Sequence, residues 1–176
     1  MLRLIIPSWA AGLMNAVGDM WLMANTFLLF TLEGHSFGVG IDEIVRVYPA
    51  LEIDEISEGP ALLSGLFTVA GKKIPVLDLR QRLQLPKRLI TPDDVLVVGE
   101  SDAVEFAFFA DSLIGVHSFS DTEICDSQKV YPELAGHISR LAEFSGKTVW
   151  VYTLARLFAE PDFPVLMAAV AKAGNR

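Results

Sequence analysis

One segment, residues 63–80, constrains the fold more than any other part of the chain. Two apolar runs, residues 66–69 and 74–79, flank the short polar link Ala70-Gly71-Lys72-Lys73. Large apolar and β-branched residues on both arms, with a glycine between them that can adopt positive φ, predict a β-hairpin. Pro75 has no N–H to donate, so the second arm is expected to lie at a sheet edge or to begin there.

The apolar side chains of this hairpin suit two interpretations. Leu66, Phe67 and Val69 alternate with small or polar residues. Such a strand usually buries one face in a core, and it can also pair with a foreign strand or pack on a partner helix. The segment carries no catalytic motif and no cluster of metal ligands. We therefore expect a rigid binding surface here, centred on the edge and the tip of the hairpin.

Other short apolar runs predict further strands, separated by turns rich in Gly and Pro. This spacing favours small barrels, with two halves that meet near residues 91–94. A helical turn is expected at residues 79–85 and an amphipathic helix at residues 163–173. The expected strands are residues 27–32, 36–41, 44–48, 95–98, 106–109, 114–119 and 149–154.

Residues 65–80 resemble a family signature, Gly-apolar-apolar-x-x-x-Gly-x-x-Ile-Pro-Val-x-Asp-Leu-Arg. The pattern is similar to that of CheW, the adaptor that couples chemoreceptors to the histidine kinase CheA. Residues 26–47 resemble the opening hairpin of that family, residues 106–116 its middle strand, and residues 146–158 its last strand and the turn that follows. The resemblance extends over residues 26–158.

The resemblance implies a mainly β fold. Two small SH3-like, five-stranded β-barrel lobes would pack together across an apolar seam, followed by a C-terminal helix. The expected organisation is an apolar extension over residues 1–25, a CheW-like domain over residues 26–158 with lobes of about 26–90 and 91–158, and the helix within residues 159–176.

The resemblance also implies a function. The protein would be a non-catalytic cytoplasmic adaptor between the tip of a methyl-accepting chemotaxis receptor and the regulatory domain of a CheA-like kinase, in chemotaxis or in a related pathway such as one that controls type IV pili. The residues expected to bind the receptor are Ile44, Arg46, Leu66, Phe67, Ala70 and Gly71. Those expected to bind the kinase are Asp111, Leu113 and Val116.

Two positions depart from the family pattern. Ala70 stands where CheW proteins commonly carry Arg, and Arg46 stands where they commonly carry Glu. In the family these positions resemble an ion pair beside the receptor-facing groove. Because both have changed, neither leaves an unpaired charge behind. We expect the fold to persist and the receptor contact to differ, as in a member that serves another array.

Composition excludes several classes of protein. The chain has 14 Lys and Arg against 22 Asp and Glu, a net charge of −8, which argues against a nucleic-acid binder. A hydrophobic content of 52% supplies a core and leaves apolar surface for a partner. With Cys125 as the single cysteine, an internal disulfide and a thiolate metal cage are both excluded.

Candidate chemistry is sparse. His35, His117 and His137 are far apart in sequence and lack the spacing of metal ligands. Cys125 follows acidic residues and precedes Asp126, which disfavours a reactive thiolate. The chain has no nucleophile elbow, phosphate loop, dinucleotide fingerprint or EF-hand spacing. We expect no catalysis, metal or cofactor, although a stand-alone barrel with an apolar ligand pocket at the seam, or an enzyme whose site the sequence hides, remains open.

The first 25 residues are apolar but interrupted. Pro7, Asn15, Asp19 and Asn25 break the run, and Arg3 is its single basic residue. A spanning helix needs about 20 nearly unbroken apolar residues, and a signal peptide needs a clean apolar stretch after a basic start. We expect no membrane segment and no export signal. The alternatives are a dispensable extension, with translation starting near residues 20–23, or a short helix packed on the body.

Overall fold

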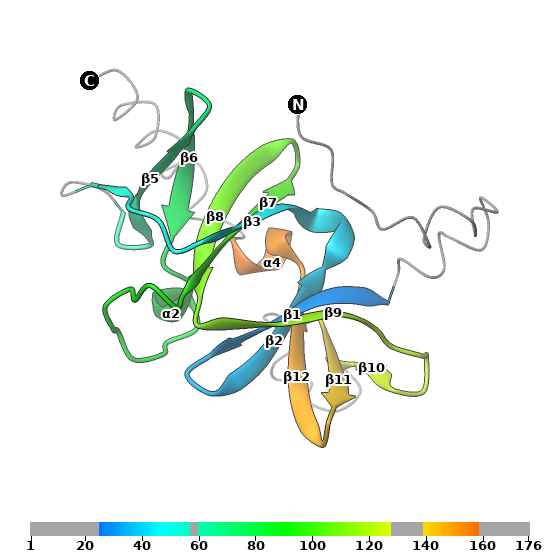
Figure 1. Cartoon of the computed structure of the whole chain (residues 1–176). Helices are drawn as coiled ribbons and strands as arrows, with labels where there is room; N and C mark the ends of the chain where they lie inside the picture. Colours follow the sequence, from blue (N-terminus) through cyan, green and yellow to red (C-terminus); the bar gives the residue numbers. More distant parts are fainter. Residues whose placement is uncertain (1–24, 57–59, 128–138, 159–176) are drawn as a thin grey trace.

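The computed structural model describes residues 25–56, 60–127 and 139–158, which form two six-stranded sheets packed together (Figure 1). The mainly β class is confirmed. The N-terminal extension and the helix expected at residues 163–173 lie outside the described residues.

The first sheet has the strand order β10-β11-β12-β2-β1-β9. Its strands are antiparallel except for the parallel pair β12–β2. Its bounds are β1 Thr26–Leu32, β2 His35–Gly40, β9 Ser112–Ser118, β10 Ile124–Asp126, β11 Arg140–Phe144 and β12 Lys147–Tyr152.

The second sheet has the order β3-β7-β8-β6-β5-β4, with one parallel pair, β6–β8. Without the short strands β4 and β10, each sheet has the five strands that were expected. Its bounds are β3 Ile44–Pro49, β4 Asp54–Glu55, β5 Leu63–Val69, β6 Lys72–Leu77, β7 Val95–Ser101 and β8 Val104–Ala110.

Each sheet takes strands from both halves of the chain. Hairpin β1–β2 belongs to the same sheet as β9 to β12, whereas hairpin β7–β8 belongs to the sheet of β3 to β6. The expected boundary near residue 90 therefore separates two halves of the sequence and does not separate the sheets. The chain crosses between the sheets after β2, through the 3-10 turn η2 (Ile41–Glu43), and again after β8.

The two halves are structural repeats. Read from β9 to β10, the first sheet matches the second read from β3 to β4, so β1 to β6 correspond to β7 to β12. A shift of 69 residues (106 − 37) superimposes Phe37 on Phe106, Asp42 on Asp111 and Val47 on Val116, and a shift of 75 residues (146 − 71) superimposes Gly71 on Gly146. The register shift in β1–β9 recurs at the equivalent place in β3–β7. We call β1 to β6 the first repeat and β7 to β12 the second.

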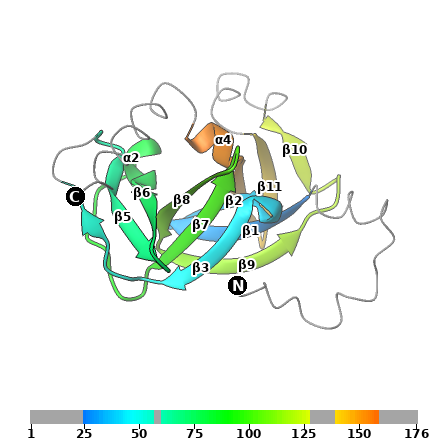
Figure 2. The same cartoon turned by 90° about the horizontal axis from the view of Figure 1, so that it is seen from above.

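Strand β1 shows how the core is organised. Phe27 and Leu29 belong to a cluster inside the first sheet, while Leu28 and Phe30 belong to a cluster shared by both sheets. Burial on both faces explains why its apolar run is continuous. In the shared cluster the Phe30 and Phe108 rings lie 5.4 Å apart between centroids, and Figure 2 shows the sheets that supply them side by side. A third cluster fills the second sheet.

The β5–β6 hairpin confirms the strongest expectation from the sequence. Its turn consists of Ala70 and Gly71, both with positive φ (48° and 79°), which is the type I′ turn that suits the twist of a two-residue hairpin. At the start of the hairpin a Cβ on Gly65 would lie 2.5 Å from the carbonyl oxygen of Asp54 on β4. A side chain at this position would therefore separate β4 from β5.

The expectation that Pro75 marks a sheet edge was wrong. Strand β6 lies inside the second sheet, between β5 and β8. Pro75 is opposite Leu66 of β5, and the pairing with β8 begins only at Val76. The missing N–H is tolerated because the ladder to β8 starts after the proline.

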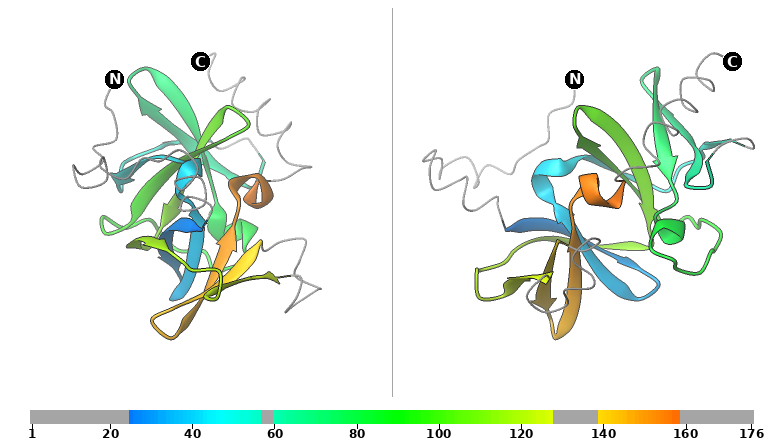
Figure 3. Two further views of the ribbon diagram at one scale, coloured as in Figure 1. Left: turned by 90° about the vertical axis from the view of Figure 1, so that its right-hand side faces the viewer. Right: turned by 180° about the vertical axis from the view of Figure 1, so that it is seen from behind.

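Two one-turn helices follow equivalent hairpins and contact each other. Helix α2 (Leu79–Arg82) is capped by Asp78, which accepts from Gln81 N at 2.9 Å, and helix α4 (Leu154–Leu157) by Thr153. Arg82 Nε donates to the carbonyl oxygen of Leu157 at 2.8 Å. Figure 3 shows the two helices from behind. Asp78 thus caps α2, whereas Arg80 in the same helix pairs with Glu33 and Asp111.

Candidate interaction surfaces

The apolar side chains of the β5–β6 hairpin are core residues. Leu66 is 3% exposed and Phe67 is 5% exposed, and the Phe67 ring packs edge to face on Tyr48 at 5.1 Å. Of the four hairpin residues predicted to bind the receptor, only Ala70 and Gly71 at the tip are exposed. Leu66 and Phe67 therefore belong to the core, as one of the two interpretations of this hairpin expected, and Ala70 and Gly71 at the tip stay the predicted receptor contact.

The other residues predicted for the receptor side, Ile44 and Arg46, lie on the edge strand β3. Ile44 is half-buried against the shared core, whereas Arg46 is exposed. The Arg46 guanidinium lies 5.8 Å from the centre of the Tyr48 ring and donates from Nη1 to its hydroxyl at 3.1 Å. A cation–π contact thus holds Arg46 where the family commonly has an ion pair.

The residues predicted for the kinase side lie along or beside β9, an edge strand of the first sheet. Leu113 packs against the shared core, and Val116 is 57% exposed. Ile114, which the prediction omitted, is 38% exposed. Exposed and half-buried residues alternate along β9, so Ile114 could have been predicted as exposed only if the bounds of the strand, Ser112–Ser118, had been known.

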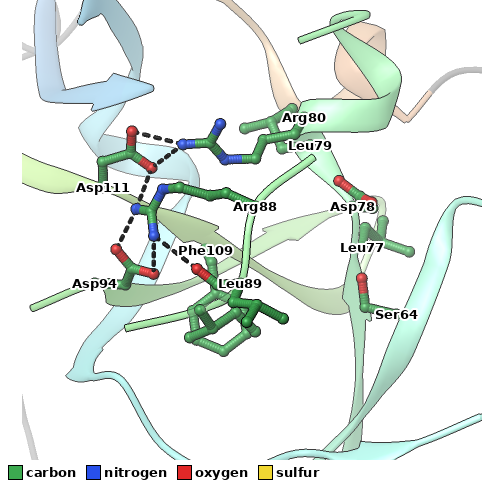
Figure 4. Close-up of a pocket in the computed structure, with 11 residues that line it drawn as sticks. Ser64, Leu77, Asp78, Leu79, Arg80, Arg88, Leu89, Asp94, Phe109 and Asp111 are labelled. Carbon is green, nitrogen blue, oxygen red and sulfur yellow. Dashed lines mark hydrogen bonds and ion pairs between the residues drawn. The ribbon is translucent and has the colours of Figure 1, made fainter. Parts of the chain in front are cut away.

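Asp111, the third residue predicted for the kinase side, has partners within the chain. It stands where the chain passes from β8 to β9, and it accepts from Arg80 Nη2 at 2.5 and 2.7 Å and from Arg88 Nη2 at 2.8 Å (Figure 4). It also accepts from the backbone N–H of Glu33 at 2.8 Å. Its carboxylate is thus committed to partners within the chain, which makes it a structural residue beside the predicted kinase surface.

Asp111 belongs to a charge cluster formed by Glu33, Arg80, Arg88, Asp94 and Asp111. Arg88 pairs with Asp94, which is 4% exposed and also accepts from Thr91 N at 2.8 Å. Arg80 donates to Glu33 at 2.8 Å. The sequence suggested no such cluster, because its members come from four separate segments.

The cluster keeps its buried carboxylates ionised. Burial alone would raise the pKa of Asp94 and Asp111. Burial is the largest single influence on each group, but hydrogen bonds from the arginines and from backbone N–H groups, with the charges of the arginines, together outweigh it, so both pKa values lie below the ordinary value of 3.8. The same contacts raise the pKa of both arginines. Ionised pairs therefore anchor this corner of the fold at neutral pH.

The cluster borders a small hollow of about 110 Å³ (Figure 4). Leu77, Leu89 and Phe109 line its apolar side, and Leu89 itself is 87% exposed. Ligand pockets usually measure about 300–1,000 Å³, and both arginines here are already paired with carboxylates. The hollow is therefore smaller than a usual ligand site, and its two arginines are committed to carboxylates of the chain.

Other kinds of site find no support among the described residues. Within residues 25–56, 60–127 and 139–158, no three His, Cys, Asp or Glu side chains converge as metal ligands. No helix in the same ranges is long and apolar enough to cross a membrane.

Comparison with known proteins agrees with the two-sheet architecture. The model of the CheW-like domain matches residues 26–162. The chain belongs to the CheW-like domain family. Among solved structures, the scaffolding protein TtCheW from Thermoanaerobacter tengcongensis has a TM-score of 0.68 at 22% identity, over 77% of this chain and 93% of that one. No curated protein matches the chain. The family and fold expected from the sequence are thus confirmed.

Proposed function

We propose that this CheW-like protein is a non-catalytic cytoplasmic adaptor. It would join a receptor-like coiled-coil tip to the regulatory domain of a CheA-like kinase, in chemotaxis or in a related pathway such as control of type IV pili. The observation that carries the proposal is the CheW-like match over residues 26–162, which includes both predicted surfaces.

The shared core gives the proposal a physical mechanism. Strand β3 belongs to one sheet and β9 to the other, and both sheets contribute to a single hydrophobic cluster. Two binding surfaces on one rigid body would hold receptor and kinase at a fixed spacing. Movement of the receptor would then bias the conformational equilibrium of the kinase.

The receptor side would be specific to this chain. Arg46 presents a positive charge beside an aromatic ring, and the hairpin tip offers only the small residues Ala70 and Gly71. A receptor that suits a family member with Glu and Arg at these places would meet a different charge here. Arg46→Glu is expected to weaken binding of the cognate receptor, and unchanged binding would remove Arg46 from the receptor surface.

Titration calorimetry against the regulatory domain of the CheA-like kinase from the same organism tests the kinase side. We expect micromolar binding that Val116→Asp weakens at least tenfold, because an unpaired charge would be placed in an apolar contact. Leu89→Asp is the matched control, since Leu89 is also an exposed aliphatic residue but belongs to the loop after α2.

Two results would contradict the proposal. Absence of binding to every such kinase of the organism would leave the fold assignment intact and remove the signalling role. Equal weakening by Val116→Asp and Leu89→Asp would mean that β9 is not the kinase surface.

A further inference from the structure

Neither repeat completes a sheet by itself. In the first sheet, β1 and β2 of the first repeat pair with β9 and β12 of the second repeat. In the second sheet, β7 and β8 of the second repeat pair with β3 and β6 of the first repeat. The shared cluster buries side chains of both repeats, among them Phe30 and Phe108. Each repeat therefore needs the first hairpin of another repeat to complete its sheet.

A second copy of the chain can supply that hairpin as well as the same chain can. If the second repeat came from another copy, the four ladders between repeats and the shared core would form with the same contacts. Domain swapping exchanges identical elements in this way, and only the connecting segment changes its conformation. In this protein the connecting segment is residues 83–94, which join α2 to β7 (Figure 1). The conformation of this segment therefore decides between the two arrangements.

The backbone of the connecting segment is strained at its start. Residues 83–94 contain no helix or strand, and Gln84 has a φ of 55°. A residue with a Cβ is disfavoured in this left-handed region, because the Cβ comes too close to the following carbonyl oxygen. A short connection under strain favours domain swapping, since the strain is released when the connection extends. Gln84 is thus placed as a hinge between the two repeats.

Most of the connecting segment gains little from burial against the body. Residues 86–93 are all exposed, and the side chain of Leu89 is 87% exposed. Polar contacts hold this stretch in place. Arg80 Nη1 donates to one of its carbonyl oxygens at 3.0 Å, and Arg88 pairs with Asp111 at 2.8 Å. Because water can replace polar contacts, extension of this stretch loses much less than the release of a buried apolar face would.

We propose that the protein forms a domain-swapped dimer, in which the second repeat of each copy completes its sheets with the first repeat of the other copy. The dimer contains the ladders and the core of the monomer twice, so its stability relative to two monomers depends on the hinge and on concentration. Exchange requires the repeats to separate, so it takes place when chains fold together. One consequence rests on the proposed function: the dimer carries two receptor surfaces and two kinase surfaces.

Disulfide cross-linking of the full chain tests the proposal. Thr31 of β1 is opposite Ser112 of β9, and their hydroxyl oxygens lie 2.7 Å apart. In the monomer these residues belong to one chain, whereas in the swapped dimer they belong to two. Thr31→Cys and Ser112→Cys, each combined with Cys125→Ser, are mixed in denaturant, refolded together and oxidised. We expect a cross-linked species of twice 19.3 kDa, whose fraction rises between about 10 µM and 1 mM protein.

Two controls make the result specific. The double variant Thr31→Cys/Ser112→Cys, refolded alone at low concentration, should form the disulfide within one chain and so verify refolding and geometry. Lys73→Cys mixed with Ser112→Cys should not cross-link, because Lys73 is exposed on β6 of the other sheet. Co-expression of the paired variants gives the same comparison without refolding.

Three results would overturn the proposal. The first is absence of the cross-linked species from both the refolded and the co-expressed mixtures. The second is equal cross-linking by the Lys73→Cys control, which would mean unspecific association. The third concerns the hinge: Gln84→Gly removes the strain from the monomer and should lower the cross-linked fraction, so an unchanged fraction would exclude residue 84 as the hinge. The kinase titration is a separate measurement, so the dimer and the adaptor role can fail independently.

Discussion

The chain crosses from one sheet to the other at two equivalent places, which differ in how they are fixed. After β2 the crossing is held by Glu43, whose Oε1 accepts from the backbone N–H of Leu154 at the start of α4 at 2.8 Å. After β8 it is held by Asp111, which is paired with Arg80 and Arg88. One crossing thus uses hydrogen bonds from a carboxylate to backbone groups, and the other uses ion pairs.

The electrostatic consequences are opposite. Burial raises the pKa of Glu43 above its ordinary value of 4.5, whereas arginine contacts lower the pKa of Asp111 despite burial. The difference traces to α2 and α4, because Ala155 occupies the position in α4 that Arg80 occupies in α2. Without an arginine there, Asp42, the counterpart of Asp111, stays exposed. Two repeats of one topology can therefore stabilise the same crossing by different chemistry.

Replacement of Arg80 should cause the largest loss of stability, because it removes the ion pairs that distinguish the crossing after β8 from the crossing after β2. Arg80→Met keeps most of the buried stem but removes the partner of Asp111 and Glu33. We expect a loss of about 2–3 kcal/mol in the free energy of unfolding, below the range for fully buried pairs because both carboxylates remain partly exposed. Denaturant unfolding measures the loss, with Lys73→Met as control on an exposed site. Equal effects of the two variants would mean that the cluster does not anchor the fold.

Asp111→Asn should rank second and change the response to acid. The lowered pKa of Asp111 means that its contribution is present above 3.8 and is lost as the pH falls through its folded value. We expect a loss of about 2 kcal/mol at pH 7 and a smaller loss of stability on acidification than in the unmodified chain. Unfolding curves at pH 7 and at pH values below 3.8 provide the measurement. If the free energy of unfolding falls equally with pH in the variant and in the unmodified chain, Asp111 does not contribute to the acid sensitivity.

Glu43 should show the opposite pH dependence and a smaller effect. Its raised pKa means that the folded state favours the protonated form, so the contribution is full below 4.5 and is lost as the pH rises through the folded value. Glu43→Gln retains an acceptor for Leu154 N and should remove this loss, whereas Glu43→Ala should cost about 1 kcal/mol. The pH profile of the melting temperature of Glu43→Gln is compared with that of the unmodified chain, and identical profiles would contradict the assignment. The difference in stability between Glu43→Ala and Glu43→Gln at one pH measures the hydrogen bond to Leu154 N.

The smallest effect tests whether the turns of the β5–β6 and β11–β12 hairpins are equivalent. Gly71 and Gly146 occupy equivalent turns with φ of 79° and 72°, and a Cβ at either position would meet no atom within 4 Å. Gly71→Ala and Gly146→Ala should therefore each cost about 1 kcal/mol, from backbone conformation alone. Chemical denaturation of the two variants checks this, and a clear difference would mean that the hairpin turns are not equivalent.

The strands that were predicted are those with continuous or alternating apolar runs, such as β1, β5 and β7. Strands β4, β10 and β11 were missed, because residues 54–55, 124–126 and 140–144 are short segments with charged or small residues and pair as strands only beside their neighbours in the sheets. The division of the sequence into two halves also did not predict which strands share a sheet. It depends on which hairpin pairs with which sheet, a long-range choice that local patterns do not encode.

The predicted site residues divide in the same way. Arg46, Ala70, Gly71 and Val116 are exposed, as a contact residue must be, whereas Leu66 and Phe67 are buried. Asp111 shows why the two classes could not be separated beforehand. Its role depends on Arg80 and Arg88, which lie 31 and 23 residues away in the sequence and meet it only through the tertiary fold.

The sequence by itself determined the mainly β class, the β5–β6 hairpin with its positive-φ turn and the CheW-like family, because these depend on local periodicity, on backbone preferences and on a contiguous signature. Only the tertiary structure decided that the repeats exchange hairpins, that the charge cluster forms and that β3 and β9 lie at sheet edges. These features depend on contacts between segments far apart in the chain, and the free energy of such contacts is set by burial and by distance in space.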